Sequence, residues 1–120
     1  MKSNTGNQSA KKVGVSTGLV KLLRIQASDT HVLEFDDVDT RFNDCCNWQV
    51  MANGERVLFS TRTYEHFADV KSGIVATIGV CENRATASDE AMLESAKIMI
   101  AVLEHFPSFA ALTRHPARIH

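Results

Sequence analysis

The dipeptide Asn53-Gly54 constrains the fold more than any other feature, because it lies between two short stretches of β-prone residues. A two-residue type I′ turn requires positive φ at both central positions, and asparagine and glycine tolerate it best. The sequence therefore predicts a tight hairpin in which Trp48 opposes Phe59. Alternation places Met51 and Leu58 on the outer face. The face expected to join the core carries Trp48, Val50, Val57 and Phe59.

A second hairpin is predicted before the first. Residues 19–25 and 32–35 are rich in branched apolar side chains, and the turn residues Ser28-Asp29-Thr30 separate them. Two hairpins followed by helical patterns are typical of an α+β domain with a small antiparallel sheet packed by two amphipathic helices.

The first helix is expected where Phe67, Val70, Ile74 and Ile78 recur at helical spacing, with Gly79 as its C-terminal cap. The second begins at an N-cap, either Thr86 or Ser88, and reaches about His105. Its predicted apolar stripe consists of Met92, Leu93, Ala96, Met99, Ile100 and Leu103.

Two apolar residues of the second helix, Ile98 and Val102, lie off that stripe. They need another surface to cover them, which predicts self-association as a homodimer. Pro107 ends the helical pattern, and the tail residues Phe106, Phe109 and Leu112 either pack back on the core or meet a partner.

Composition favours one domain, because 120 residues with 44% hydrophobic content suffice for a single core. Residues 1–16 are polar and basic and are expected to be a flexible tail, either a solvated leader or a basic arm for an acidic partner or nucleic acid. Residues 17–120 would form the α+β domain. No apolar run approaches the ~20 residues of a membrane span. Three cysteines, of which Cys45 and Cys46 are adjacent, favour a cytoplasmic protein over a disulfide framework.

Charge is uneven along the chain, because residues 27–44 hold six carboxylates and one arginine. We interpret the stretch Glu34–Asp44 as a solvated loop or as an electrostatic recognition surface that imitates nucleic-acid phosphates. It lacks the glycine and terminal glutamate of a calcium loop. The candidate protein-binding residues are Glu34, Asp36, Asp37, Asp39 and Asp44.

Catalytic chemistry has no recognisable motif here. The histidines show no metalloprotease spacing, no cysteine or histidine pairs stand at zinc-finger spacing, and no glycine loop for phosphate is present. We therefore predict no catalytic residue, metal or cofactor. Direct nucleic-acid binding is disfavoured too, because Trp48 and Phe59 are assigned to the core rather than to an exposed stacking face.

The Asn53-Gly54-Glu55 turn, Ser60, Tyr64, Lys71 and the Gly73-Ile74 pair resemble the YegP-like family of small bacterial proteins built from a β-β-β-α unit. The resemblance covers about residues 46–78. Where the family has a serine cap and a lysine, this chain has His66 and Phe67. The resemblance implies the fold and self-association, and it suggests residues 19–35 as a degenerate first copy of the unit.

Three classes of function remain at this point. The favoured one is a non-enzymatic protein–protein interaction module whose partner is itself or a basic nucleic-acid-binding protein. The alternative is a mobile-element inhibitor of a host nucleic-acid enzyme, such as an anti-CRISPR factor, acting through the acidic surface. The third is an enzyme or metal protein using Asp36, Asp37, Asp39 and a histidine.

Overall fold

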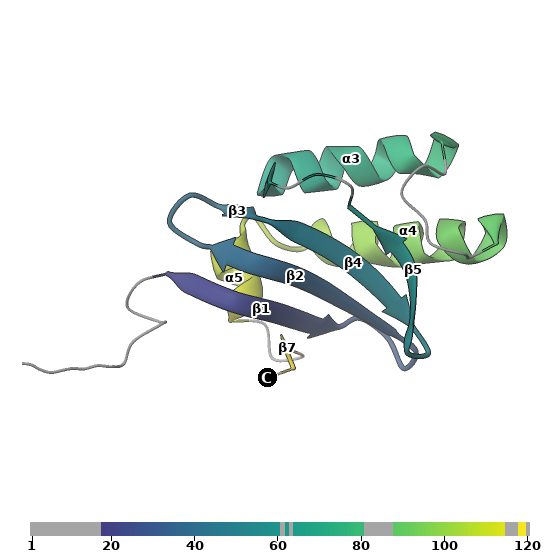
Figure 1. Ribbon diagram of the computed structural model, residues 1–120, viewed down its shortest axis with the longest axis horizontal. Helices are drawn as coiled ribbons and strands as arrows, with labels where there is room; N and C mark the ends of the chain where they lie inside the picture. The colour runs from purple at the N-terminus through teal and green to yellow at the C-terminus, as the bar shows by residue number, and fades with distance from the viewer. Residues whose placement is uncertain (1–17, 61, 63, 81–87, 115–117, 120) are drawn as a thin grey trace, which may run out of the picture.

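The computed structural model describes residues 18–60, 62, 64–80, 88–114 and 118–119. Its long strands are β1 (Leu19–Gln26), β2 (His31–Asp39), β4 (Asn47–Ala52) and β5 (Glu55–Phe59), and its short ones are β3 (Asp44–Cys45), β6 (Glu65–His66) and β7 (Arg118–Ile119). The helices are α3 (Phe67–Val80), α4 (Asp89–Leu103) and α5 (Phe109–Thr113) (Figure 1). The predicted α+β class is confirmed, with α5 as an additional helix. The predicted tail, residues 1–16, and the alternative cap Thr86 lie outside the described residues.

The sheet is antiparallel with the order β5-β4-β2-β1-β7, and β3 joins β2 to β6 at one end. The predicted first hairpin is confirmed, since Leu23 pairs with Phe35 and Ile25 with Leu33. Its turn is held by Ser28, whose hydroxyl accepts hydrogen bonds from the backbone N–H groups of Thr30 and His31. Such a side-chain contact is the usual reason for serine in a turn.

The Asn53-Gly54 turn is also confirmed, because both residues have positive φ, at 52° and 83°. The register beyond it differs from the prediction. Met51 pairs with Arg56 as expected, but Val50 then pairs with Leu58, so Val57 is the extra residue of a β-bulge.

The bulge reverses the predicted faces of β5 after Val57. Leu58 is fully buried beside Val50, whereas Phe59 pairs with Gln49 on the other face and is only half-buried. The expected packing of Trp48 against Phe59 is therefore wrong. The ring of Phe59 lies instead under the Arg56 guanidinium, 4.4 Å from the ring centroid.

Helix α3 confirms the spacing of Phe67, Val70 and Ile74, all of which are buried. The side chain of Ile78 lies outside the described part. Gly79 does not end the helix, since α3 continues to Val80, so the predicted cap is wrong.

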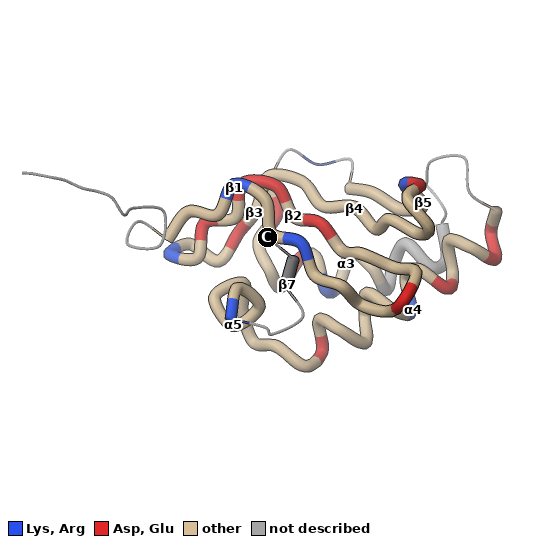
Figure 2. The backbone as a smooth tube through the Cα atoms, turned by 90° about the horizontal axis from the view of Figure 1, so that it is seen from below, with Lys and Arg blue, Asp and Glu red and all other residues tan. Residues whose placement is uncertain are grey.

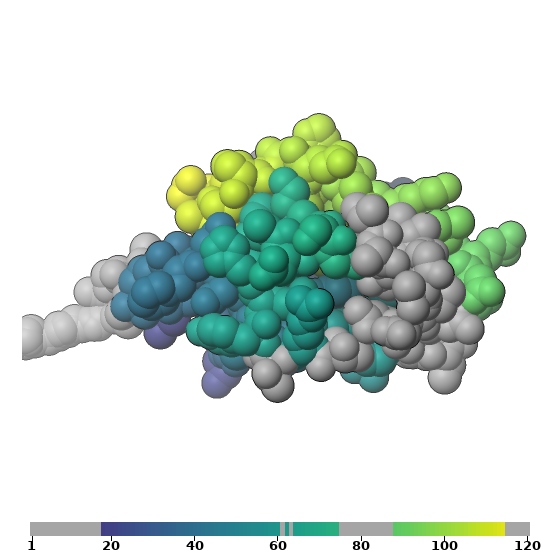
Figure 3. Space-filling view, turned by 90° about the horizontal axis from the view of Figure 1, so that it is seen from above, coloured from purple at the N-terminus to yellow at the C-terminus, as the bar shows by residue number. Residues whose placement is uncertain are grey.

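Of the two predicted N-caps of helix α4, Ser88 is the one observed, and its hydroxyl accepts a hydrogen bond from the N–H of Ala91 at 3.1 Å. Its buried face holds Met92, Ser95, Ala96, Met99 and Leu103, and α3 lies beside it over the sheet (Figure 3). Leu93 and Ile100 are only half-buried. The predicted stripe is thus confirmed at four of its positions and is narrower than expected.

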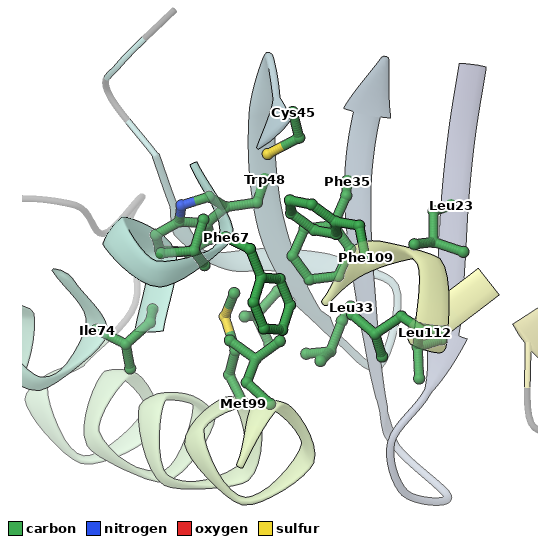
Figure 4. Close-up of a cluster of buried hydrophobic side chains, with 14 of the residues drawn as sticks. Leu23, Leu33, Phe35, Cys45, Trp48, Phe67, Ile74, Met99, Phe109 and Leu112 are labelled. Atoms are coloured by element: carbon green, nitrogen blue, oxygen red, sulfur yellow. The ribbon is translucent and has the colours of Figure 1, made fainter. Parts of the chain in front are cut away.

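The core lies between the sheet and the helices, which all pack on one face of it (Figures 1 and 2). Phe109 of α5 is at its centre, with ring centroids 5.3 Å from Phe35 and 4.9 Å from Phe67 in edge-on geometry (Figure 4). Asn43 holds both neighbouring helix starts, because its carbonyl accepts from the Phe67 N–H and its side chain from the Phe109 N–H. Phe109 and Leu112 are fully buried, so at these two positions the tail packs back.

Candidate interaction surface

The acidic segment is a strand rather than the predicted loop over most of its length. Strand β2 extends to Asp39, and Asp36 lies in it between Leu22 of β1 and Asn47 of β4. Asp37 follows with φ of 49°, a conformation that aspartate tolerates better than most residues. Both side chains are exposed at this end of the sheet.

Two of the five predicted binding residues already have cationic partners. The Glu34 carboxylate is 3.0 Å from Arg24 Nε and also accepts a hydrogen bond from Gln49, and its side chain is only 14% exposed. Asp39 forms a two-pronged ion pair with Arg41, whose hydrogen bonds hold the pKa of Asp39 below its usual value. The charges of Glu34 and Asp39 are therefore balanced within the chain, and the five-residue binding surface stays a prediction.

The remaining three carboxylates, Asp36, Asp37 and Asp44, gather around one thiol. The pKa of Cys46 is raised first by burial and then by the negative charges of Asp37, Asp44 and Asp36. The pKa of Asp36 is itself raised by burial and by the charges of Asp37 and Glu34. Acidic residues on β2 and β3 lie together in Figure 2. The three carboxylates thus form a concentrated negative surface.

Large apolar side chains border these carboxylates. Tyr64 is 61% exposed, and the negative charge of Asp44 is the main cause that raises the pKa of its phenol. Leu22 is 45% exposed and lies directly across from Asp36. We call Leu22, Asp36, Asp37, Asp44 and Tyr64 the acidic end. Sequence reasoning missed Tyr64 and Leu22, because only the fold shows that they are left uncovered.

The predicted self-association residues, Ile98 and Val102, are half-buried. Val102 packs against the core, so part of the expected need for a second surface is met within the chain. Together with Ala27, Ala101, His105 and Phe106 they line a shallow apolar groove of about 470 Å³. No residue described in the structure fills this groove, and self-association through Ile98 and Val102 stays a prediction.

A buried carboxylate that the sequence did not single out is Glu65. Its Oε1 accepts hydrogen bonds from Trp48 Nε1 at 2.8 Å and Ser60 Oγ at 2.7 Å. Arg62 stands 4.0 Å from its second oxygen. These contacts tie β6 to the β4–β5 hairpin and satisfy the buried carboxylate with charge-assisted hydrogen bonds.

The cysteines give no reactive thiol among the described residues. Burial raises the pKa of Cys45 to about 12, so that its sulfur stays protonated at neutral pH. Cys45 and Cys46 are both free. Within the described ranges, no three residues of histidine, cysteine, aspartate or glutamate are grouped to hold a metal ion.

No family model, curated protein or solved structure matches the chain. The YegP-like resemblance therefore stays a prediction. Among the helices of the described part, none is long and apolar enough to cross a membrane.

Proposed function

We propose that this protein is a non-enzymatic interaction module that binds a basic protein partner through the acidic end. The observation that carries the proposal is the grouping of three carboxylates, Asp36, Asp37 and Asp44, between the exposed side chains of Leu22 and Tyr64. None of the three has a cationic partner among the described residues. We propose the cytoplasm as its location, where the free thiols of Cys45 and Cys46 would persist.

Charge and apolar area have different roles in this proposal. Concentrated negative charge accelerates and orients the encounter with a basic surface, and salt weakens that effect. Aromatic side chains such as Tyr64 contribute most of the affinity once they are desolvated in a contact. A surface that offers both beside a rigid strand is therefore suited to a specific, salt-sensitive contact.

The test is affinity capture with the full chain and with a variant in which Asp36, Asp37 and Asp44 are changed to lysine. A matched control changes Glu55, Asp69 and Glu94, which are exposed elsewhere, to lysine and alters net charge equally. We expect a basic protein to be retained by the wild type and the control, to be released by salt, and to be lost from the acidic-end variant. Equal retention by both folded variants would overturn the proposal.

The inhibitor hypothesis is a narrower form of the same proposal. Carboxylates spaced along a strand can occupy a groove that normally holds nucleic-acid phosphates. A captured nuclease or other nucleic-acid enzyme whose activity falls on binding would support an anti-CRISPR-like role. A captured basic protein without such activity would favour a general adaptor.

Homodimer formation is a separate proposal, supported by the apolar groove that contains Ile98 and Val102. Sedimentation at micromolar concentration measures it directly, with Ile98→Glu as the disrupting variant. We expect a dimer that the variant converts to monomer. A wild-type monomer would remove this proposal without affecting the acidic end.

A further inference from the structure

A polar cavity lies on the face of the sheet that the helices leave open, next to the acidic end. It has a volume of about 270 Å³ and is formed by β2, β4 and β5. Its lining residues are Asp36, Asn47, Trp48, Gln49, Arg56, Phe59 and Ser60. Small-molecule pockets usually measure about 300–1,000 Å³, so this cavity suits a single side chain better than a cofactor.

The two carboxamides of the cavity have fixed orientations. Asn47 Nδ2 donates a hydrogen bond to the Arg62 carbonyl at 2.7 Å, and Gln49 Nε2 donates one to the Glu34 carboxylate at 2.5 Å. Both partners are acceptors only, so the amide nitrogens must face them. The carbonyl oxygens of Asn47 and Gln49 are therefore left as acceptors.

Asp36 adds a third oxygen acceptor. Among the described residues, no donor forms a hydrogen bond with its carboxylate, and partial burial with the charges of Asp37 and Glu34 raises its pKa. A cation placed beside Asp36 would favour its charged form and thereby offset both effects. The one cationic side chain that lines the cavity is Arg56, which is exposed and lies over the Phe59 ring.

We propose that this cavity receives an arginine side chain of the partner, held by the Asp36 carboxylate and the carbonyl oxygens of Asn47 and Gln49. The inference rests on the proposed function and names the chemistry of the contact. A guanidinium presents five N–H donors in a planar fork, whereas an ammonium presents a compact point charge. Three separate acceptors on a sheet surface match the fork better.

The first experiment titrates the full-length ¹⁵N-labelled protein with N-acetyl-arginine amide. Its neutral isostere N-acetyl-citrulline amide and N-acetyl-lysine amide are the comparison probes. We expect saturable shifts of the Asn47 and Gln49 side-chain NH₂ signals with the arginine probe, and at least threefold weaker binding of the other two. Equal or unsaturable responses to all three probes would overturn the proposal.

Variants separate the cavity from the general charge of the acidic end. Asp36→Asn and Gln49→Leu each remove one acceptor, and Asp37→Asn removes a neighbouring charge that does not line the cavity. We expect the first two to weaken arginine-probe binding at least fivefold and the third less than twofold. If Asp37→Asn weakens the probe as much as Asp36→Asn does, general charge rather than the cavity binds it, and the proposal fails.

The proposed function can survive that failure. In one outcome, the lysine variant of Asp36, Asp37 and Asp44 loses the basic partner, whereas Gln49→Leu affects neither probe binding nor partner binding. That outcome would retain the acidic end as the contact and reject the arginine site. Reduced partner binding by Gln49→Leu, with unchanged unfolding midpoint, would support the site.

Discussion

The two faces of the sheet are built from adjacent residues of the same strands, yet they differ in polarity and in exposure to solvent. The helix-covered face presents Leu23, Leu33, Phe35, Trp48 and Val50, which are almost entirely inaccessible to solvent. The open face presents Arg24, Glu34, Asp36, Asn47 and Gln49 from the intervening positions. Because strand side chains alternate, one strand can serve both roles at once.

The difference indicates how unequally the two faces contribute to stability, and the proposed contact lies on the face that contributes less. On the covered face, removing apolar area from water stabilises the fold by roughly 25 cal/mol per Å². On the open face, Glu34 contacts both Arg24 and Gln49 across three strands, whereas no donor among the described residues bonds the Asp36 carboxylate. The polar groups of the open face are therefore only partly provided with hydrogen-bond partners by the described residues, which is consistent with the proposed contact.

The largest predicted effect lies on the covered side. Phe109→Ala should lower the free energy of unfolding by about 3–5 kcal/mol, because it empties the space between Phe35 and Phe67. Phe42→Ala is the matched control, since the ring of Phe42 is 64% exposed, and it should change stability by less than about 0.5 kcal/mol. Chemical denaturation measures both. Similar losses would contradict the division between core and surface.

How far the sequence predicts this division depends on the element. It predicted both hairpins, narrowed the α4 cap to Thr86 or Ser88, and placed Phe67, Val70 and Ile74 on the buried face of α3, because turn chemistry and periodicity are local signals. It missed the bulge at Val57, since Val57, Leu58 and Phe59 are all apolar and either register would bury some of them. A one-residue slip exchanges the two faces of a strand.

Only the carboxylates of the acidic end were predicted, because its other features also depend on strand register and on tertiary packing. The sequence showed that carboxylates cluster, but the pairing of Glu34 with Arg24 depends on the register of β1 with β2. Tyr64 and Leu22 became candidates only when the fold left them exposed. Charge density is visible in sequence, whereas charge neutralisation is a tertiary property.

A middle-sized effect on stability is expected at the Asn53-Gly54 turn, which joins β4 and β5. Gly54→Val should cost roughly 1–2 kcal/mol, because the φ of 83° disfavours a β-branched residue. A Cβ at this position would have no atom within 4 Å, so the cost is conformational rather than steric contact. Gly54→Asn should therefore retain most of the stability. Coincident unfolding midpoints for wild type and the valine variant would refute this explanation.

A smaller effect is expected at the solvent-exposed start of α4, which covers the sheet. Ser88→Ala removes the acceptor of the Ala91 N–H and should cost about 1 kcal/mol. Ser72→Ala is the control, because Ser72 is also exposed but bonds carbonyls within α3, where alanine is the better helix former. We expect the control to be neutral or slightly stabilising in thermal unfolding. Equal losses would show that the cap has no special role.

The smallest effect should be a gain of stability on the open face. The folded-state pKa of Asp36 is raised above the ordinary 3.8, so its charge opposes folding at neutral pH, and this penalty disappears as pH falls to about the unfolded value. Asp36→Asn should therefore raise the urea midpoint at pH 7 and leave it nearly unchanged at pH 4. Asp39→Asn should instead lower the urea midpoint at pH 7. The pKa of Asp39 is lowered in the folded state, so its charge stabilises the fold above the unfolded pKa, and this stabilisation is lost as pH falls. If both variants moved the midpoint in the same direction at pH 7, the distinction between Asp36, whose charge opposes folding, and Asp39, whose charge is stabilised by Arg41, would fail. Opposite shifts would show that stability is given up at Asp36, as expected where a residue is retained for binding.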